Sequence, residues 1–189
     1  LAQVYMLLAG PDERDTLTLS QPPPHLNGVH AVGSLAGLRV GLYRAWNSDS
    51  DPEVAAAVEQ FARQLEQRGA ELVEITIPHL QMIARAHAIT IVSEMATAMH
   101  RFYPEHRGNF GTDVRLSLSM AETFSSVDYI AAQKVRTLTA NIMREVFQKV
   151  DIVLSPTTAV PAPEIPEVAI PEGIADTTSL SQLMRYVFI

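Results

Sequence analysis

The chain has no cysteine and only two lysines among its 189 residues, and other features that would point to a particular chemistry are also missing. Without cysteine there is no disulfide, no thiolate nucleophile and no cysteine-ligated zinc site. No apolar run approaches the roughly 20 residues of a membrane-spanning helix. The net charge of −7 offers no basic surface for a phosphate backbone, so we expect no nucleic-acid partner. The six histidines show no metal-ligand spacing, and we expect no metal site.

Glycine is present but scattered. No two of the nine glycines are adjacent, so the chain lacks a Gly/Ser-rich loop that could offer several backbone N–H groups to an oxyanion. What the chain does contain is typical of a globular protein, with 47% hydrophobic and 19% charged residues. Its length suffices for one sizeable core, or for part of a larger one.

The first half of the sequence predicts a strand, a helix and a second strand. Residues 38–43 are apolar enough for a strand, and residues 52–68 have the periodicity of a helix that Asp51 caps and Gly69 ends. Residues 71–77 predict another strand, which Pro78 ends. A strand–helix–strand succession over this length is a βαβ unit, so we expect the two strands to be parallel with a right-handed crossover.

The second half is mostly helical. We expect a helix over 80–102, a loop over 103–109, a short helix over 113–121, a long helix over 128–149 and a strand over 151–154. Proline-rich stretches over 11–34 and from the last strand to Pro171 predict surface loops. The chain is therefore expected to be α/β with a substantial helical layer.

Both ends of the sequence carry apolar residues at helical spacing without a complete set of start and stop signals. The N-terminal set is Leu1, Val4, Tyr5 and Leu8, and the C-terminal set is Leu180, Leu183, Met184, Val187 and Phe188. We therefore expect residues 1–189 to be an internal or C-terminal-half fragment of one larger domain. Its cellular location stays open, although the composition favours an intracellular protein.

The segment from Asp151 to Pro163 is the most informative of the sequence. A short buried strand has to end at Pro156, which has no N–H for a ladder. Thr157 and Thr158 then offer hydroxyl groups at the carboxyl end of that strand, where open α/β sheets bind their ligands.

This segment and several others resemble the amidase signature family, and within it most closely the plant-type fatty acid amide hydrolases. The resemblance covers nearly the whole chain and is most specific in Asp128–Gln133 together with Asp151–Thr158. The supporting segments are Gly10–Asp15, Gly33–Leu35, Pro52–Val54, Val73–Ile75, Ala86–Ile89 and Leu183–Arg185. It implies part of a mixed β-sheet flanked by helices, and amide hydrolysis without a cofactor.

The resemblance also implies that the catalytic residues are not in this chain. The family uses a serine nucleophile, a second serine joined by a cis peptide and a lysine, all in segments N-terminal to Leu1. The only lysines, Lys134 and Lys149, are expected to be solvated on the long helix. The one adjacent serine pair, Ser125-Ser126, is expected to cap that helix, and Ser155 is expected to serve a turn.

By the same resemblance, four residues match positions that line the acyl-chain channel of the family. They are Ala88, Ser117, Met120 and Phe124. Their spacing alone favours core packing between two helices, and only the resemblance supports a channel, so both interpretations stay open. We expect His87 to be a packed core histidine, and Arg136 and Arg144 to pair with nearby acids.

The function implied by the resemblance is that of a fragment of an amidase whose substrate is expected to be a long-chain N-acyl amide. The chain alone is then expected to be inactive, and the partner is a small, lipid-like amide. Two alternatives stay open: another amidase substrate class, such as the amidotransferase A-type subunits, or a truncated, non-catalytic binding protein. A homodimer and a peripheral membrane contact of the parent protein are also left open.

Overall fold

The computed structural model describes residues 2–20, 22, 25, 33–162, 164, 165, 167 and 181–189. These residues fall into two compact units, over residues 1–35 and 36–189. The smaller unit contains the predicted N-terminal helix, α1 (Ala2–Leu8), and a 3-10 turn, η1 (Thr16–Thr18). The side chain of Asp15 caps this turn by accepting a hydrogen bond from the Leu17 N–H at 3.1 Å.

The larger unit is built on a three-stranded parallel sheet with the order β2-β1-β3. The strands are β1 (Arg39–Leu42), β2 (Glu71–Glu74) and β3 (Ile152–Leu154). The predicted βαβ unit is confirmed, because helix α3 (Pro52–Gln67) connects β1 to its parallel neighbour β2. β2 ends at Glu74, earlier than predicted, because its partner β1 ends at Leu42 and the chain then enters the short helix α2 (Arg44–Asn47).

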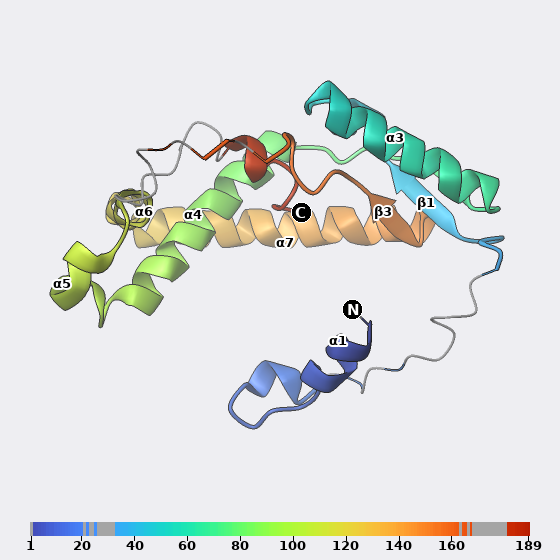
Figure 1. Ribbon diagram of the computed structural model, residues 1–189. Coiled ribbons are helices and arrows are strands. Elements are labelled where there is room, and N and C mark those ends of the chain that lie inside the picture. Colours follow the sequence, from blue (N-terminus) through green and yellow to red (C-terminus); the bar gives the residue numbers. More distant parts are fainter. Residues whose placement is uncertain are drawn as a thin grey trace. The chain divides into compact units, whose positions relative to one another are not determined.

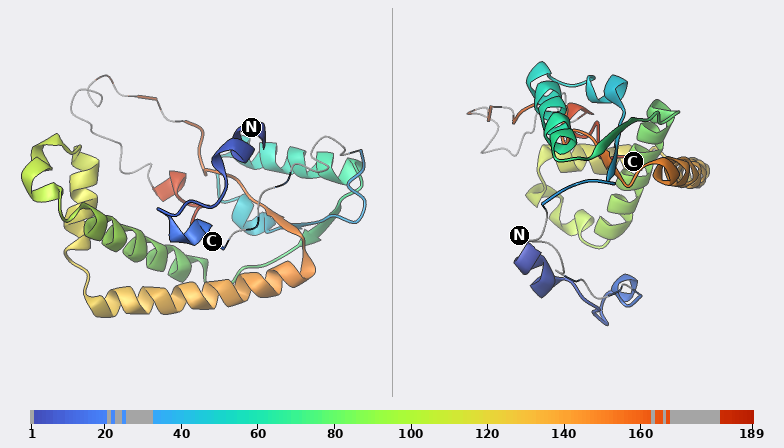
Figure 2. Two further views of the ribbon diagram at one scale, coloured as in Figure 1. Left: turned by 90° about the horizontal axis from the view of Figure 1, so that it is seen from below. Right: turned by 90° about the vertical axis from the view of Figure 1, so that its right-hand side faces the viewer.

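Helices cover both faces of this sheet, with α3 on one face and α7 (Ser126–Lys149) on the other (Figures 1 and 2). Val40 and Leu42 are fully buried, and Gly41 between them faces the opposite side of the sheet. A Cβ atom at Gly41 would lie 3.1 Å from side-chain atoms of both Ile75 and Val150. The absence of a side chain at Gly41 therefore allows the end of α7 to pack closely on the sheet.

Four further elements complete the helical layer. They are α4 (Leu80–Met99), α5 (Tyr103–His106), the 3-10 turn η2 (Arg107–Asn109) and α6 (Thr112–Ala121). Helix α4 packs against both α6 and α7. The loop predicted over residues 103–109 is wrong, because Pro104 lies in the first turn of α5, where a helix needs no N–H from that residue.

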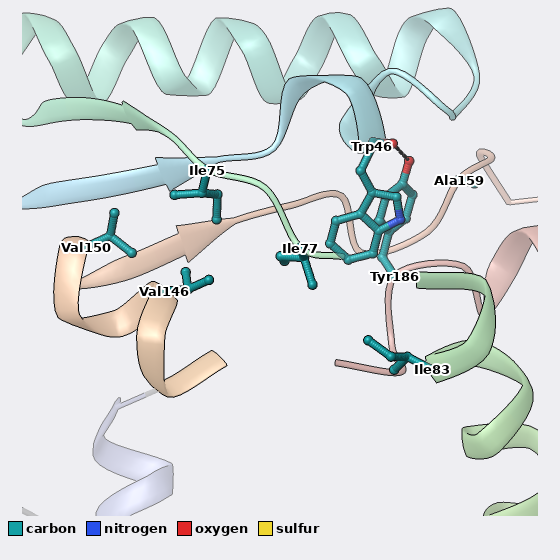
Figure 3. Close-up of a cluster of buried hydrophobic side chains, with 8 residues drawn as sticks. All are labelled: Trp46, Ile75, Ile77, Ile83, Val146, Val150, Ala159 and Tyr186. Carbon is teal, nitrogen blue, oxygen red and sulfur yellow. Dashed lines mark hydrogen bonds between the residues drawn. The ribbon is translucent and has the colours of Figure 1, made fainter. Parts of the chain in front are cut away.

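A cluster of buried side chains joins the sheet to α4, α7 and the C-terminal segment (Figure 3). Its members are Trp46, Ile75, Ile77, Ile83, Val146, Val150, Ala159 and Tyr186. Phe188 packs against this cluster, so the C-terminal apolar residues bury part of their surface there. Leu180, the first residue of that predicted apolar face, lies outside the described residues.

The α/β class predicted from the sequence is thus confirmed, with three parallel strands in the described part of the chain. None of the helices that the structure describes combines the length and apolar character needed to cross a membrane.

Candidate functional site

A cavity of about 720 Å³ lies between α4, α7 and the carboxyl end of the sheet, within the larger unit. This volume falls within the roughly 300–1,000 Å³ typical of small-molecule sites. Residues from α4 form one wall and residues from α7 the other, while Trp46, Ile77, Val153, Ser155 and the segment 186–189 complete the lining. The site is therefore located where a parallel sheet is expected to bind its ligands.

The wall formed by α4 follows helical periodicity. Its lining residues are Ile83, Ala86, His87, Thr90, Ile91 and Glu94, which recur every three or four positions. Two of them, His87 and Glu94, carry ionisable groups, and Thr90 carries a hydroxyl. One stripe of α4 thus gives the cavity an apolar surface with polar groups toward the C-terminal half of the helix.

The wall formed by α7 is more apolar. Its lining residues are Ala132, Val135, Arg136, Thr139, Ala140, Met143 and Phe147. The Thr139 hydroxyl donates a hydrogen bond to the Val135 carbonyl at 2.9 Å, so it is engaged by its own helix. Ala132 and Ala140 are small, which leaves space between the helices, and Met143 offers a flexible apolar surface. This wall suits a hydrocarbon group.

Two hydrogen bonds join α4 to α7 at the polar end of the cavity. The Gln133 amide donates to the Thr90 hydroxyl at 3.0 Å, and the Tyr129 hydroxyl donates to the Glu94 carboxylate at 3.0 Å. The hydrogen bond to Glu94 raises the pKa of Tyr129 above its ordinary value. Because the residue number rises along α4 as it falls along α7, the two helices are antiparallel here.

Aromatic residues close the opposite end of the cavity. The ring centroid of Trp46 lies 4.8 Å from that of Tyr186 and 6.0 Å from that of Phe188. The Tyr186 hydroxyl donates to the Trp46 carbonyl at 2.9 Å, as the dashed line in Figure 3 shows. Burial raises the pKa of Tyr186, and an ion pair of 2.6 Å between Arg185 and Asp49 holds the same segment in place.

The segment that follows β3 reaches the cavity at Ser155. Pro156 is buried, Thr157 is exposed, and the Thr158 hydroxyl donates to the Val160 carbonyl at 2.8 Å. The predicted position of this segment at the carboxyl end of a strand is therefore confirmed. Of its hydroxyl groups, only that of Ser155 belongs to a residue lining the cavity.

His87 and Arg136 are the histidine and the arginine among the residues that line the cavity. The Nε2 atom of His87 is buried and has no hydrogen-bond partner in the described part of the chain. Arg136 is exposed, and in the described part of the chain its guanidinium lies 3.5 Å from the Gln133 amide oxygen. His87 thus lines a cavity rather than being fully packed in a core.

The prediction that Arg136 and Arg144 pair with acids is wrong. Within the described residues no ion pair joins either to a carboxylate, and Arg144 donates to the Asn141 amide oxygen at 2.6 Å. The reason is local, because the residue one helical turn before each arginine is an amide, Gln133 or Asn141, rather than an acid.

The four residues predicted to line an acyl channel lie elsewhere, on α4 and around α6. Ala88 is exposed on α4, while Ser117 is half-buried on α6 and donates to the Asp113 carbonyl at 3.0 Å. Met120 is 44% exposed near the end of α6, and Phe124 is half-buried in the turn that precedes α7. None of the four lines the 720 Å³ cavity. Their role in binding stays a prediction.

The remaining candidates behave as ordinary structural residues. Ser125 forms a capping box with Asp128, accepting from the Asp128 N–H at 3.2 Å while the Asp128 carboxylate accepts from the Ser125 N–H at 2.8 Å. The Ser125 hydroxyl also donates to the Asp128 carboxylate at 2.6 Å, and this hydrogen bond together with that from the Ser125 N–H lowers the pKa of Asp128. Lys134 and Lys149 are exposed. No three histidine, aspartate or glutamate side chains gather as a potential metal site in the described ranges.

The residues that sequence reasoning missed are those of the α7 wall. Ala132, Val135, Thr139 and Met143 repeat every three or four positions, and this periodicity is typical of any buried helix face and does not by itself indicate a cavity beside it. A clue was available in the small residues among the lining, Ala86 on one helix and Ala132 and Ala140 on the other. Facing small side chains leave space that large ones would fill.

The fold and the cavity together define an α/β protein with a mainly apolar cavity at the carboxyl end of a parallel sheet. The family model "Amidase" matches residues 1–188. The chain therefore belongs to the amidase family, as its resemblance to the amidase signature enzymes predicted.

Individual relatives agree with this assignment. A fatty acid amide hydrolase from Medicago truncatula is 33% identical over 99% of this chain and 32% of its own length. The A-type subunit of a glutamyl-tRNA(Gln) amidotransferase from Akkermansia muciniphila is 29% identical over 89% of this chain and 41% of its own length. The chain thus spans about a third of the length of the fatty acid amide hydrolase that it matches.

A solved structure supports the fold. The crystal structure of a bacterial aryl acylamidase of the amidase signature family matches 84% of this chain and 34% of its own chain, with a TM-score of 0.65 and 22% identity. The described part of the chain therefore has the fold of part of an amidase signature enzyme.

Proposed function

We propose that this chain is part of an amidase that hydrolyses a carboxylic amide, and that the 720 Å³ cavity holds the acyl group of the substrate. The observation that carries the proposal is a mainly apolar cavity at the carboxyl end of the sheet in a chain of the amidase family. The identity of 33% with a fatty acid amide hydrolase supports a long-chain N-acyl amide as the substrate.

The chemistry assigned to the complete protein is acyl transfer through a serine. The oxygen of the nucleophilic serine attacks the amide carbonyl carbon, and its proton passes to the second serine and the lysine. The amine then leaves with a proton. Water then cleaves the resulting ester and releases the acid. The chain described here has no Gly/Ser-rich segment for the nucleophile and oxyanion, so its role is to bind the acyl group.

The proposal predicts that residues 1–189 alone turn over no amide or ester. Ser155 is the one serine lining the cavity, and in the described ranges neither lysine accompanies it there. Purified chain would be assayed with amide and ester substrates, together with a Ser155→Ala variant. Turnover that disappears in the variant would contradict the proposal, because it would make Ser155 a nucleophile.

The substrate class is tested with the complete protein and a series of N-acyl ethanolamides from acetyl to stearoyl. We expect kcat/KM to rise with chain length until the cavity is filled, because each added methylene group buries more apolar surface. A maximum at the acetyl amide would contradict a long-chain substrate. Binding of the whole series without any turnover would instead favour a non-catalytic binding protein.

The identity of 29% with an amidotransferase A-type subunit supports a second candidate, an amidase that releases ammonia from a small polar amide such as glutamine. The apolar walls formed by α4 and α7 favour the first candidate. Ammonia release from glutamine at a higher kcat/KM than from any N-acyl ethanolamide would decide for the second.

A further inference from the structure

The negative charge of the chain is not distributed evenly. Residues 100–109, which include α5 and η2 and are called the α5 corner below, contain two arginines, two histidines and one glutamate. With neutral histidines this corner carries one net positive charge, whereas the whole chain carries a net charge of −7. The sign of the α5 corner is therefore opposite to that of the chain as a whole.

The arginines of the α5 corner have no acidic partner. Arg101 and Arg107 are both exposed, and within the described ranges neither forms an ion pair with a carboxylate. Phe102, which lies between them in the sequence, is 58% exposed. An exposed aromatic ring beside two unpaired cations suits a partner surface that is both anionic and apolar.

The fold gives this corner a defined shape. Pro104 lies in the first turn of α5, and the Phe102 carbonyl accepts a hydrogen bond from the His106 N–H at 3.1 Å. The rings of Tyr103 and Phe110 meet edge to face, with their centroids 5.5 Å apart. Tyr103 and Phe110 are half-buried. These two rings therefore anchor the corner, while Phe102 remains exposed.

The α5 corner lies at the end of the helical layer, away from the sheet (Figures 1 and 2). It directly follows α4, and Thr90 and Glu94 of that helix line the polar end of the cavity. A corner at the end of a layer can meet an extended, flat surface, which a groove inside the fold cannot.

We propose that the α5 corner is a docking surface for the anionic face of a lipid bilayer. A bilayer presents phosphate groups and hydrocarbon chains in one surface, which matches Arg101 and Arg107 together with Phe102. The arginines approach the lipid phosphates, and the Phe102 ring enters the boundary between headgroups and acyl chains. Two cations and one ring give a weak and reversible contact.

Docking at this corner brings the polar end of the cavity close to the lipid. Under the proposed function, a long-chain amide then passes from the bilayer to the cavity over a short distance. This consequence rests on the proposed function, whereas the docking itself does not.

Flotation of the complete protein with vesicles measures docking without any turnover. The vesicles are phosphatidylcholine alone and phosphatidylcholine mixed with phosphatidylserine, each at low and at high salt. The charge variant combines Arg101→Gln with Arg107→Gln. Its matched control combines Arg63→Gln with Arg68→Gln, which makes the same change of charge at exposed arginines in α3 and at its C-terminal end.

We expect the wild-type protein to bind the phosphatidylserine vesicles more strongly than the neutral ones, and high salt to weaken this binding. The charge variant should lower the partition coefficient at low salt about 25-fold, or about fivefold for each arginine. The α3 control should keep the wild-type value.

A second pair of variants tests the aromatic ring. Phe102→Ser should lower binding at both salt concentrations, because salt does not screen the burial of apolar surface. Phe61→Ser is the matched control, since Phe61 is 48% exposed on α3. It should leave binding unchanged.

The inference is overturned if the complete protein does not bind the phosphatidylserine vesicles. It is also overturned if the α5 variants bind as the wild type does, or if the α3 controls lose as much binding as the α5 variants. A protein that cleaves no amide but binds these vesicles through the α5 corner would contradict the proposed function and still support the docking surface.

Discussion

The two sides of α4 show how differently one helix can be used. The side that meets α7 leaves a cavity of about 720 Å³, while α4 also packs against α6, where Leu118 is only 3% exposed. The four residues predicted to line an acyl channel lie on α4 and around α6. The cavity in the structure instead has α7 as its second wall.

The difference follows from side-chain size and from what holds the helices at each end. The small residues Ala86, Ala132 and Ala140 line the space between α4 and α7, and Trp46 and its aromatic neighbours line one end of it. The hydrogen bond from Tyr129 to Glu94 joins the helices at the other end. Packing in a protein interior normally fills such space. A helix pair that is fixed at two places and lined by small residues between them can retain a hollow.

The largest effect is expected from Leu118→Ala, which tests the α6 side as core. Removing a buried leucine side chain should lower the free energy of unfolding by about 2–5 kcal/mol, as measured by urea denaturation of the complete protein. At a temperature where the variant is folded, its preference between a palmitoyl and a butyryl amide should match the wild type. A selective loss of palmitoyl cleavage would show that the α6 side also binds the acyl chain.

Two methionines allow the α7 side and the α6 side of helix α4 to be compared directly. Met143 lines the cavity on α7, whereas Met120 lies on α6 and is 44% exposed. A carboxylate in an apolar cavity opposes the entry of a hydrocarbon chain, so Met143→Asp should lower kcat/KM for a palmitoyl amide about tenfold more than for a butyryl amide. Met120→Asp should lower both to a similar, smaller extent.

The reverse result would reassign the acyl channel. A palmitoyl-selective loss in Met120→Asp, with Met143→Asp affecting both amides equally, would favour the channel predicted at Ala88, Ser117, Met120 and Phe124. Thermal melting of both variants provides the control, since only folded protein should be compared.

The sequence predicted the elements of the larger unit well because their signals are local. Asp51, Pro52 and Gly69 mark the ends of α3, and the Ser125 capping box marks the start of α7. The parallel pairing of β1 with β2 followed from the βαβ pattern. Local signals failed at Tyr103–His106, which was predicted as a loop but forms the short helix α5.

The candidate site was predictable only in part, because a cavity is a property of several elements together. Ser155 was placed correctly at the carboxyl end of β3, since Pro156 determines where this strand ends. The α7 wall was missed because Ala132, Val135 and Met143 have the same periodicity as a packed core. Likewise, no sequence pattern distinguishes a satisfied histidine from one such as His87, whose Nε2 atom has no partner among the described residues.

The smallest effect is expected at the opposite, amino end of the sheet, where Asp151 connects the starts of β3 and β1. Its carboxylate accepts hydrogen bonds from the Arg39 guanidinium and the Arg39 N–H, each at 2.8 Å, and these lower the pKa of Asp151 to about 2. An unfolded aspartate has a pKa of about 3.9. The charged form is thus favoured in the folded protein, so this contribution to stability is present above about pH 4 and lost as the pH falls toward about 2.

Asp151→Asn should therefore lower the free energy of unfolding slightly at neutral pH, and the difference from the wild type should shrink as the pH falls below about 4. The pair is exposed, with 39% of each side chain accessible, so solvent screening keeps the effect small. Arg39→Met should show the same pH dependence in urea denaturation. Because this end of the sheet lies away from α4, neither variant should change the preference between palmitoyl and butyryl amides. A changed preference would mean that the Arg39–Asp151 pair is coupled through the sheet to the cavity between α4 and α7.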